Sequence, residues 1–155
     1  MLLSRHCHLI FALMPHQPIN LQQILIADRS PIFRLGMSST FKKNYESLHV
    51  HEAGNEEKLM QLFQEHSIDL LIMDDLLFEL DLRQVVKKLR QINPVTRILF
   101  FSDRGEEHFL SCMPKGGVYG YVNKKAQLPQ LLEAVKELAE GHHYFSQELL
   151  IERLL

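Results

Sequence analysis

Four polar residues of complementary chemistry each end or follow a short apolar run of the sequence. Asp28, Asp74, Ser102 and Lys124 end or follow the runs at residues 24–27, 70–73, 98–101 and 118–122. A carboxylate can act as a nucleophile, while an ammonium and a hydroxyl can hold the oxygens of a transferred phosphoryl group. Mg²⁺ is usually held by one or two carboxylates plus waters, which makes Asp28 and Asp74 candidate ligands. A purely structural Asp74–Lys124 ion pair is the alternative.

The apolar runs predict the elements that would position these side chains. Continuous short runs are typical of parallel strands covered on both faces, whereas residues 48–53 nearly alternate and predict an edge strand. Ser30 and Pro31 predict a helix start. Three further helices are indicated by apolar stripes of helical spacing. The stripes are Leu59, Met60, Leu62 and Phe63; Leu82, Val85, Val86 and Leu89; and Leu131, Leu132, Val135, Leu138 and Ala139.

Five β-α units in succession predict a parallel α/β sheet with right-handed crossovers. Such sheets place their sites at the carboxyl ends of the strands, next to the point where the strand order reverses. We therefore expect Asp28, Asp74, Ser102 and Lys124 to meet in one crevice.

Composition limits the function classes. The 155 residues carry a net charge of −2, which argues against a nucleic-acid binder. Two distant cysteines, Cys7 and Cys112, exclude a disulfide framework and favour a reduced cytoplasmic setting. No apolar stretch is long enough to span a membrane, so we expect no membrane contact. Residues 1–22 are expected to form a poorly ordered tail, with a cleaved signal as the alternative.

Several motifs in order resemble the receiver domain of bacterial two-component response regulators. They are ILIADRSP at residues 24–31, DLLIMD at 69–74, RILFFS at 97–102 and GYVNK at 120–124. EAGN at residues 52–55 and the stretch 141–155 are similar to the NarL/FixJ (LuxR-type) subfamily. The resemblance implies a flavodoxin-like (βα)5 three-layer sandwich with strand order 2-1-3-4-5. It would occupy residues 23–141, and 142–155 would form a C-terminal linker helix.

The resemblance also assigns roles. Asp74 would accept a phosphoryl group from a sensor histidine kinase, and Asp28 would help to hold Mg²⁺. Ser102 would follow the phosphoryl group, Tyr121 would rotate inward, and Lys124 would pair with Asp74. The domain would not be an enzyme beyond self-phosphorylation at Asp74. Dimers would form through the fourth helix and fifth strand, or through the C-terminal helix. In this subfamily the last segment leads to a DNA-binding domain, which this chain does not contain.

Two departures from the family pattern fall on the metal side of the pocket. Arg29 stands where the family usually has a second acidic residue, and a guanidinium repels a cation. The loop after Asp74 has neither the proline nor the glycine of the family: Phe78 and Leu82 take those positions, after Asp75.

Two hypotheses follow. In one, the domain is still phosphorylated, with Asp75 or Glu79 replacing the missing metal ligand, as the receiver of a LuxR-type DNA-binding regulator. In the other, Arg29 forks onto Asp28 or Asp74 and substitutes for the metal charge. The domain would then act through phosphorylation-independent protein contacts. A third hypothesis from a different class is a flavodoxin-like enzyme or flavin carrier, although Asp28 and Pro31 make a poor phosphate loop.

Overall fold

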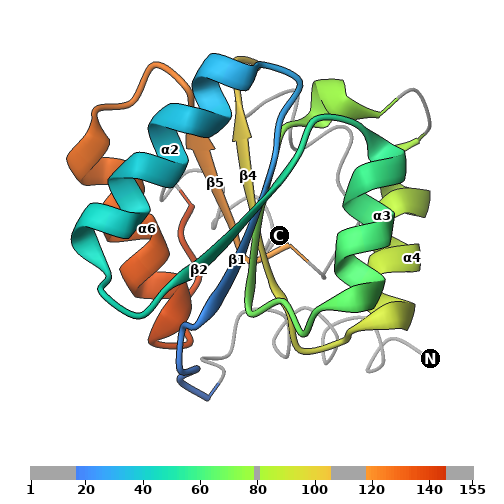
Figure 1. The fold of residues 1–155 in the computed structure, drawn as a ribbon, viewed down its shortest axis with the longest axis horizontal. Coiled ribbons are helices and arrows are strands. Elements are labelled where there is room, and N and C mark those ends of the chain that lie inside the picture. Colours follow the sequence, from blue (N-terminus) through green and yellow to red (C-terminus); the bar gives the residue numbers. More distant parts are fainter. Residues whose placement is uncertain (1–16, 79–80, 106–117, 146–155) are drawn as a thin grey trace, which may run out of the picture.

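The computed structural model describes residues 17–78, 81–105 and 118–145, which alternate between strands and helices (Figure 1). The strands are β1 (Gln23–Ala27), β2 (His49–Ala53), β3 (Leu70–Met73), β4 (Arg97–Ser102) and β5 (Gly120–Asn123). The α-helices within these ranges are α2 (Pro31–Asn44), α3 (Glu56–Glu65), α4 (Leu82–Ile92) and α6 (Leu128–Ala139), and a 3-10 turn, η1, spans Asp75–Leu77. Residues 106–117, between β4 and β5, lie outside the described residues.

The strands form one parallel sheet in the order β2-β1-β3-β4-β5, which confirms the predicted topology. The near-alternating strand β2 lies at an edge of the sheet, as its pattern predicted. After β1 the chain adds β2 on one side and then returns to add β3 on the other. The order therefore reverses at β1 and β3, and their carboxyl ends lie beside this reversal.

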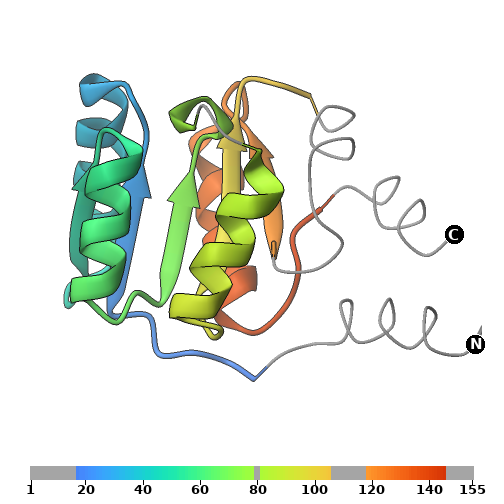
Figure 2. The same ribbon diagram turned by 90° about the vertical axis from the view of Figure 1, so that its right-hand side faces the viewer.

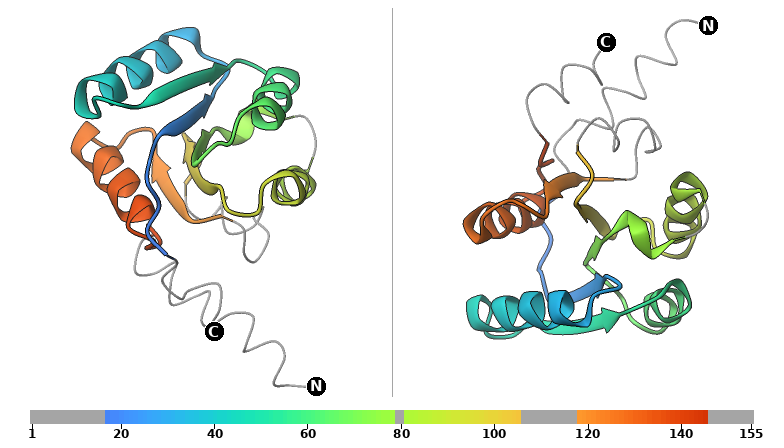
Figure 3. Two further views of the ribbon diagram at one scale, coloured as in Figure 1. Left: turned by 60° about the horizontal axis from the view of Figure 1, so that its bottom comes forward. Right: turned by 90° about the horizontal axis from the view of Figure 1, so that it is seen from above.

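Two helical layers cover the sheet. Helices α2 and α6 lie on one face, and α3 and α4 lie on the other, where they face the viewer in Figure 2. The view from above in Figure 3 shows the sheet between the two layers. Alternate residues of β1 serve both cores: Leu25 packs with the α3 and α4 side, and Ile24 and Ile26 pack with the α2 and α6 side. Burial on both faces fixes the register of each strand.

Helix starts follow the capping signals of the sequence. The Ser30 Oγ accepts a hydrogen bond of 3.3 Å from the Phe33 N–H, directly before Pro31. This confirms the predicted start of the first helix after β1. The Asn55 side chain caps α3 in the same way, accepting from the Lys58 N–H at 2.8 Å.

Residues 17–22 belong to the folded domain, so the prediction of a poorly ordered tail through residue 22 was wrong. The Ile19 N–H donates to the Ala139 carbonyl at 2.8 Å. The Asp69 Oδ2 accepts the N–H groups of both Gln22 and Gln23, at 2.9 and 2.8 Å. These bonds satisfy backbone groups at the entry to β1, which is why the segment is held. Residues 1–16 lie outside the described residues.

The segment after α6 follows β5 instead of starting a helix, which corrects the predicted linker helix for residues 142–145. The Tyr144 N–H donates to the Tyr119 carbonyl at 3.0 Å, and the Tyr121 N–H donates to the Tyr144 carbonyl at 2.9 Å. Gly120 permits this approach, because a Cβ there would lie 3.2 Å from the Tyr144 oxygen and 2.9 Å from a Leu99 methyl group. The predicted helical residues 146–155 lie outside the described residues.

None of the helices in the described ranges has the length and apolar character needed to cross a bilayer.

A histidine on β2 makes stability depend on pH. His51 bonds to the Gln23 Oε1 at 2.7 Å and stacks on His66 with 4.2 Å between ring centroids. Burial, followed by the neighbouring His66 and His49, lowers the pKa of His51. The folded state thus favours the neutral ring, and this contribution is present above pH ~6.5 and lost as the pH falls below it. We expect the free energy of unfolding, measured with urea, to fall between pH 7.5 and pH 5.

The same titration of the His51→Gln variant should show a shallower decline, because the buried imidazole is gone. Ser47→Ala, at an exposed turn position without a titratable group, serves as the control and should keep the native slope. An equal slope in the His51 variant and the native chain would contradict this assignment.

Candidate functional site

Three charged residues that are distant in sequence meet at the carboxyl end of the sheet. Asp28 follows β1, Asp74 follows β3 and Lys124 follows β5. The Lys124 Nζ lies 2.5 Å from the Asp28 Oδ2 and also donates to the Asp74 Oδ2. The two aspartates are only 3% and 4% exposed. Lys124 therefore reaches across the end of β4 and bridges two buried carboxylates, as the strand-end rule predicted.

Backbone turns hold the other oxygen of each carboxylate. The Asp28 Oδ1 accepts the Ser30 N–H at 2.8 Å, and the Asp74 Oδ1 accepts the Leu76 N–H at 2.9 Å. In each case the aspartate binds the N–H two residues later, which fixes its rotamer where the strand turns into the next element. Both carboxylates therefore present one oxygen to the Lys124 ammonium.

Burial and charge shift the ionisation of this group. Burial and the neighbouring Asp75 carboxyl raise the pKa of Asp74, although Lys124 and the Leu76 N–H act in the opposite direction. Burial lowers the pKa of Lys124, but the two carboxylates outweigh it and its pKa lies above the ordinary value. The Lys124 ammonium also lies 4.5 Å from the centre of the Phe33 ring, a cation–π contact. Lys124 is thus a cation throughout the physiological pH range.

Asp75, the next residue after Asp74, binds the hydroxyl at the end of β4. The Ser102 Oγ donates to the Asp75 Oδ1 at 2.6 Å, and both residues are buried. The Arg104 Nη1 lies 3.5 Å from the Asp75 Oδ2. The backbone N–H of Arg104 donates to the Ser102 Oγ at 3.1 Å. Asp75 therefore faces β4, and it does not replace the missing metal ligand beside Asp28. Glu79, the other residue considered for that role, lies outside the described residues.

Tyr121 of β5 continues this polar chain. Its hydroxyl donates to the Arg104 carbonyl, and its side chain is 5% exposed. The Asn123 Nδ2 donates to the same hydroxyl at 3.4 Å. Tyr121 is therefore buried against the α3 and α4 side of the core, although β5 is an edge strand.

Arg29 does not fork onto Asp28 or Asp74, so that prediction was wrong. Its Nη1 donates to the Leu76 carbonyl oxygen at 3.3 Å, and the residue is exposed. The reason is geometric: Lys124 already reaches both carboxylates from inside the pocket. Arg29 lies at the exposed rim of the pocket and binds the turn that follows Asp74.

The loop after Asp74 closes by burying its apolar residues. Asp74 caps the 3-10 turn Asp75–Leu77, and Leu77 and Phe78 are buried on the α3 and α4 side of the sheet. Phe78, in the family's proline position, is therefore held in the core on the α3 and α4 side.

Two arginines of the site were missed from the sequence. The Arg34 Nη1 donates to the Asp28 carbonyl at 2.6 Å and its Nε lies 3.9 Å from Glu52, which ties the β1 and β2 ends together. The sequence did contain a signal for Arg34: it lies one helical turn after Ser30, which places its side chain near the end of β1. Arg104 lies in an irregular loop, and no periodic pattern in the sequence could place it at the site.

Removing the bridging charge should destabilise the domain strongly. In the Lys124→Met variant Asp28 and Asp74 would stay buried without a counter-ion, at a cost of about 3 kcal/mol in the free energy of unfolding. Urea unfolding at pH 7.5 measures it. Lys125→Met, at the exposed neighbouring position, should change stability by less than about 0.5 kcal/mol. Adding Asp74→Asn to Lys124→Met should recover part of the loss. Equal stabilities of the two lysine variants would contradict the buried bridge.

Comparison with known proteins agrees with this geometry. Residues 24–136 match the family model of the response regulator receiver domain. The transcriptional activator protein ExaE of Pseudomonas putida is 35% identical over 126 residues, which cover 81% of this chain and 59% of ExaE. The Fimbriae Z protein of Salmonella typhimurium is 28% identical over 127 residues, covering 82% of this chain and 60% of that protein. The chain therefore spans about three fifths of the length of these relatives.

Among solved structures, a LuxR-family two-component response regulator from Aurantimonas superposes with a TM-score of 0.73. It is 24% identical, and the match covers 86% of this chain and 96% of that one. Receiver domains are signalling modules rather than enzymes of the usual kind. With its five-stranded sheet and its strand-end residues, this chain belongs to the receiver domains of two-component response regulators.

Proposed function

We propose that this receiver acts through protein contacts in a state that depends on neither phosphorylation of Asp74 nor Mg²⁺. One observation carries the proposal: cationic side chains of the protein itself bind the oxygens on the metal side of the pocket. Lys124 contacts a carboxylate oxygen of both Asp28 and Asp74, and Arg29 donates to the Leu76 carbonyl oxygen.

Receiver domains commonly hold a divalent ion in the acidic pocket, but the residues of this pocket fit one poorly. Mg²⁺ requires oxygen ligands in near-octahedral geometry. Here Arg29 stands where the family has its second acidic residue. The Asp75 carboxylate binds Ser102 and Arg104. Over the described ranges, the cluster of His, Cys, Asp and Glu ligand atoms close enough to share an ion lies elsewhere, at the end of α6. No step of the proposed function therefore uses Mg²⁺.

Asp75 supports the same proposal from the other side of the pocket. A phosphoryl group on Asp74 would bring a charge of about −1.5 to −2 next to the buried Asp75 carboxyl. The Ser102 hydroxyl already donates to Asp75 at 2.6 Å. Asp75 thus takes the place that the resemblance gave to a phosphoryl oxygen as the acceptor for Ser102. It also binds Arg104, whose carbonyl accepts from the Tyr121 hydroxyl, so Tyr121 is linked to Asp75 without phosphorylation.

The second candidate function is a phosphorylated receiver within a longer DNA-binding regulator. It is favoured by the activator ExaE, of which the match covers 59%. A sensor histidine kinase would be the partner in this case. Dimerisation through the fourth helix and fifth strand, or through the C-terminal helix, and a cytoplasmic location both stay predictions. Membership in the receiver family argues against the flavin hypothesis.

Phosphorylation can be tested directly. After incubation with Mg²⁺ and acetyl phosphate, intact-mass analysis of the native chain should show no adduct. Arg29→Asp, which removes the guanidinium and supplies an acid, should show a phosphoryl adduct that disappears in Arg29→Asp/Asp74→Asn. Ready labelling of the native chain, lost in Asp74→Asn, would contradict the proposal and favour the second candidate.

The link between Ser102 and Asp75 predicts a stability effect with a local signature. Ser102→Ala leaves a buried carboxylate oxygen without its hydroxyl donor, which should cost about 2 kcal/mol in urea unfolding. The NMR signals of the Tyr121 ring should shift, because Arg104 loses its bond to the Ser102 hydroxyl. Ser47→Ala, at an exposed turn position, is the control and should change neither quantity. Unchanged Tyr121 signals in the Ser102 variant would show that the two residues are not coupled.

A further inference from the structure

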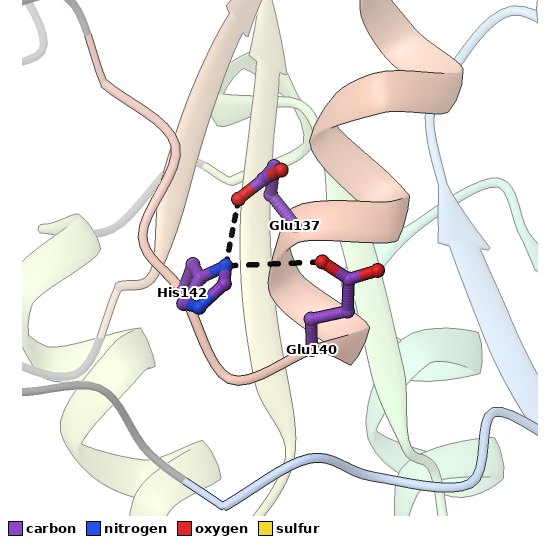
Figure 4. Close-up of side chains that lie close together, drawn as sticks. All are labelled: Glu137, Glu140 and His142. Atoms are coloured by element: carbon purple, nitrogen blue, oxygen red, sulfur yellow. Dashed lines mark hydrogen bonds and ion pairs between the residues drawn. The ribbon is translucent and has the colours of Figure 1, made fainter.

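We propose that Glu137, Glu140 and His142 form a binding site for a divalent transition-metal ion, with Zn²⁺ as the best match. The three side chains converge at the carboxyl-terminal end of α6, where the imidazole lies between the two carboxylates (Figure 4). Because α6 runs antiparallel to the strands, this end of the helix lies away from the acidic pocket. The site is therefore separate from Asp28, Asp74 and Lys124.

The distances suit a tetrahedral ion. The His142 Nδ1 lies 2.8 Å from the Glu137 Oε2 and 3.9 Å from the Glu140 Oε2. All three ligand atoms lie within 4.8 Å of one another. A tetrahedral Zn²⁺ with bonds of about 2.0–2.2 Å separates its ligands by roughly 3.4 Å. The two observed distances bracket this value, so small side-chain rotations would complete the coordination.

The backbone holds these ligands in place. Glu137 and Glu140 are three residues apart and share one face of α6. Gly141 has a φ of 90°, and its N–H donates to the Leu138 carbonyl at 3.2 Å. The His142 N–H then donates to the Glu137 carbonyl at 2.9 Å, which completes a Schellman cap. This cap turns the chain back so that the imidazole faces the last helical turn, and the site needs little ordering on binding.

Electrostatics at this position favours a cation. Two carboxylates lie where the helix dipole is negative, an arrangement that is unfavourable without compensating positive charge. One imidazole nitrogen with two carboxylate oxygens is a ligand set typical of Zn²⁺ and its neighbours in the transition series, whereas Mg²⁺ and Ca²⁺ prefer oxygen alone. The side chains of Glu137, Glu140 and His142 are 35%, 47% and 48% exposed, so waters can fill the remaining coordination positions.

A bound ion would act on the segment that leaves the domain. His142 is followed by residues 143–145, and Tyr144 pairs with Gly120 beside β5. The ion would thus fasten the start of this exit segment to the end of α6. Its occupancy would change how firmly residues 143–145 are held beside β5.

The test is an NMR titration of the full-length chain with Zn²⁺, which resolves this site from His6, Cys7, His8 and His16 near the N-terminus. Amide and side-chain signals of residues 137–142 should shift saturably at micromolar Zn²⁺ and should not shift with Mg²⁺. His142→Asn and Glu137→Gln should each weaken the affinity measured at these signals by at least about tenfold. Glu133→Gln, exposed on the same helix, should retain native affinity.

Circular dichroism spectra that match the native chain establish that the variants are folded. Saturable shifts at residues 137–142 that are lost in His142→Asn support the site. No saturable shift at these residues up to millimolar Zn²⁺ would overturn the proposal, and so would equal affinity in His142→Asn. Shifts confined to the N-terminal residues would overturn it as well, because the ion would then be bound elsewhere.

Discussion

The ammonium of Lys124 is the constraint on which the carboxyl end of the sheet depends. Asp28 and Asp74 are buried side by side, and each backbone turn satisfies only one oxygen of its carboxylate. The remaining oxygens would repel each other in a low-dielectric setting. One cation between them attracts both carboxylates, and it holds the ends of β1, β3 and β5 together. The three strands thus depend on a contact made by residues that are far apart in sequence.

A third acid divides the pocket into two halves. Asp75 takes no part in the Lys124 bridge; it binds Ser102 and Arg104 on the β4 side. Because Tyr121 donates to the Arg104 carbonyl, the polar chain runs without a break from the acidic pocket to the outer strand β5. A change of charge at Asp74 would act first on Asp75 and then on this chain. The physical coupling is therefore carried by side chains that can be altered one at a time.

The sequence predicted most of the frame and part of the site. Uninterrupted apolar runs can be satisfied only by strands covered on both faces, so the strands and the residues at their ends were predictable. The partner of a long polar side chain was not predictable, because it depends on which charged groups lie within its reach in the folded structure. Arg29 was expected on a carboxylate, but Lys124 occupies that position from within the pocket. Residues 142–145 follow α6 in the sequence, yet Tyr144 pairs as a strand residue would, with Tyr119 directly before β5 and with Tyr121 of β5.

Aspartates at the two ends of the sheet are compensated by different kinds of partner. At the amino end, the Asp69 carboxylate accepts two backbone N–H groups from Gln22 and Gln23 on the same oxygen, and these donors belong to the fixed frame of the chain. The charge of Asp69 is compensated by the dipoles of these two backbone N–H groups, which the fold keeps in place. At the carboxyl end, Asp28 and Asp74 depend on the long side chain of Lys124, whose bonds can be exchanged for others without unfolding a strand. The Asp69 contact is therefore insensitive to partners, whereas any group that competes for the Lys124 ammonium changes the carboxyl end directly.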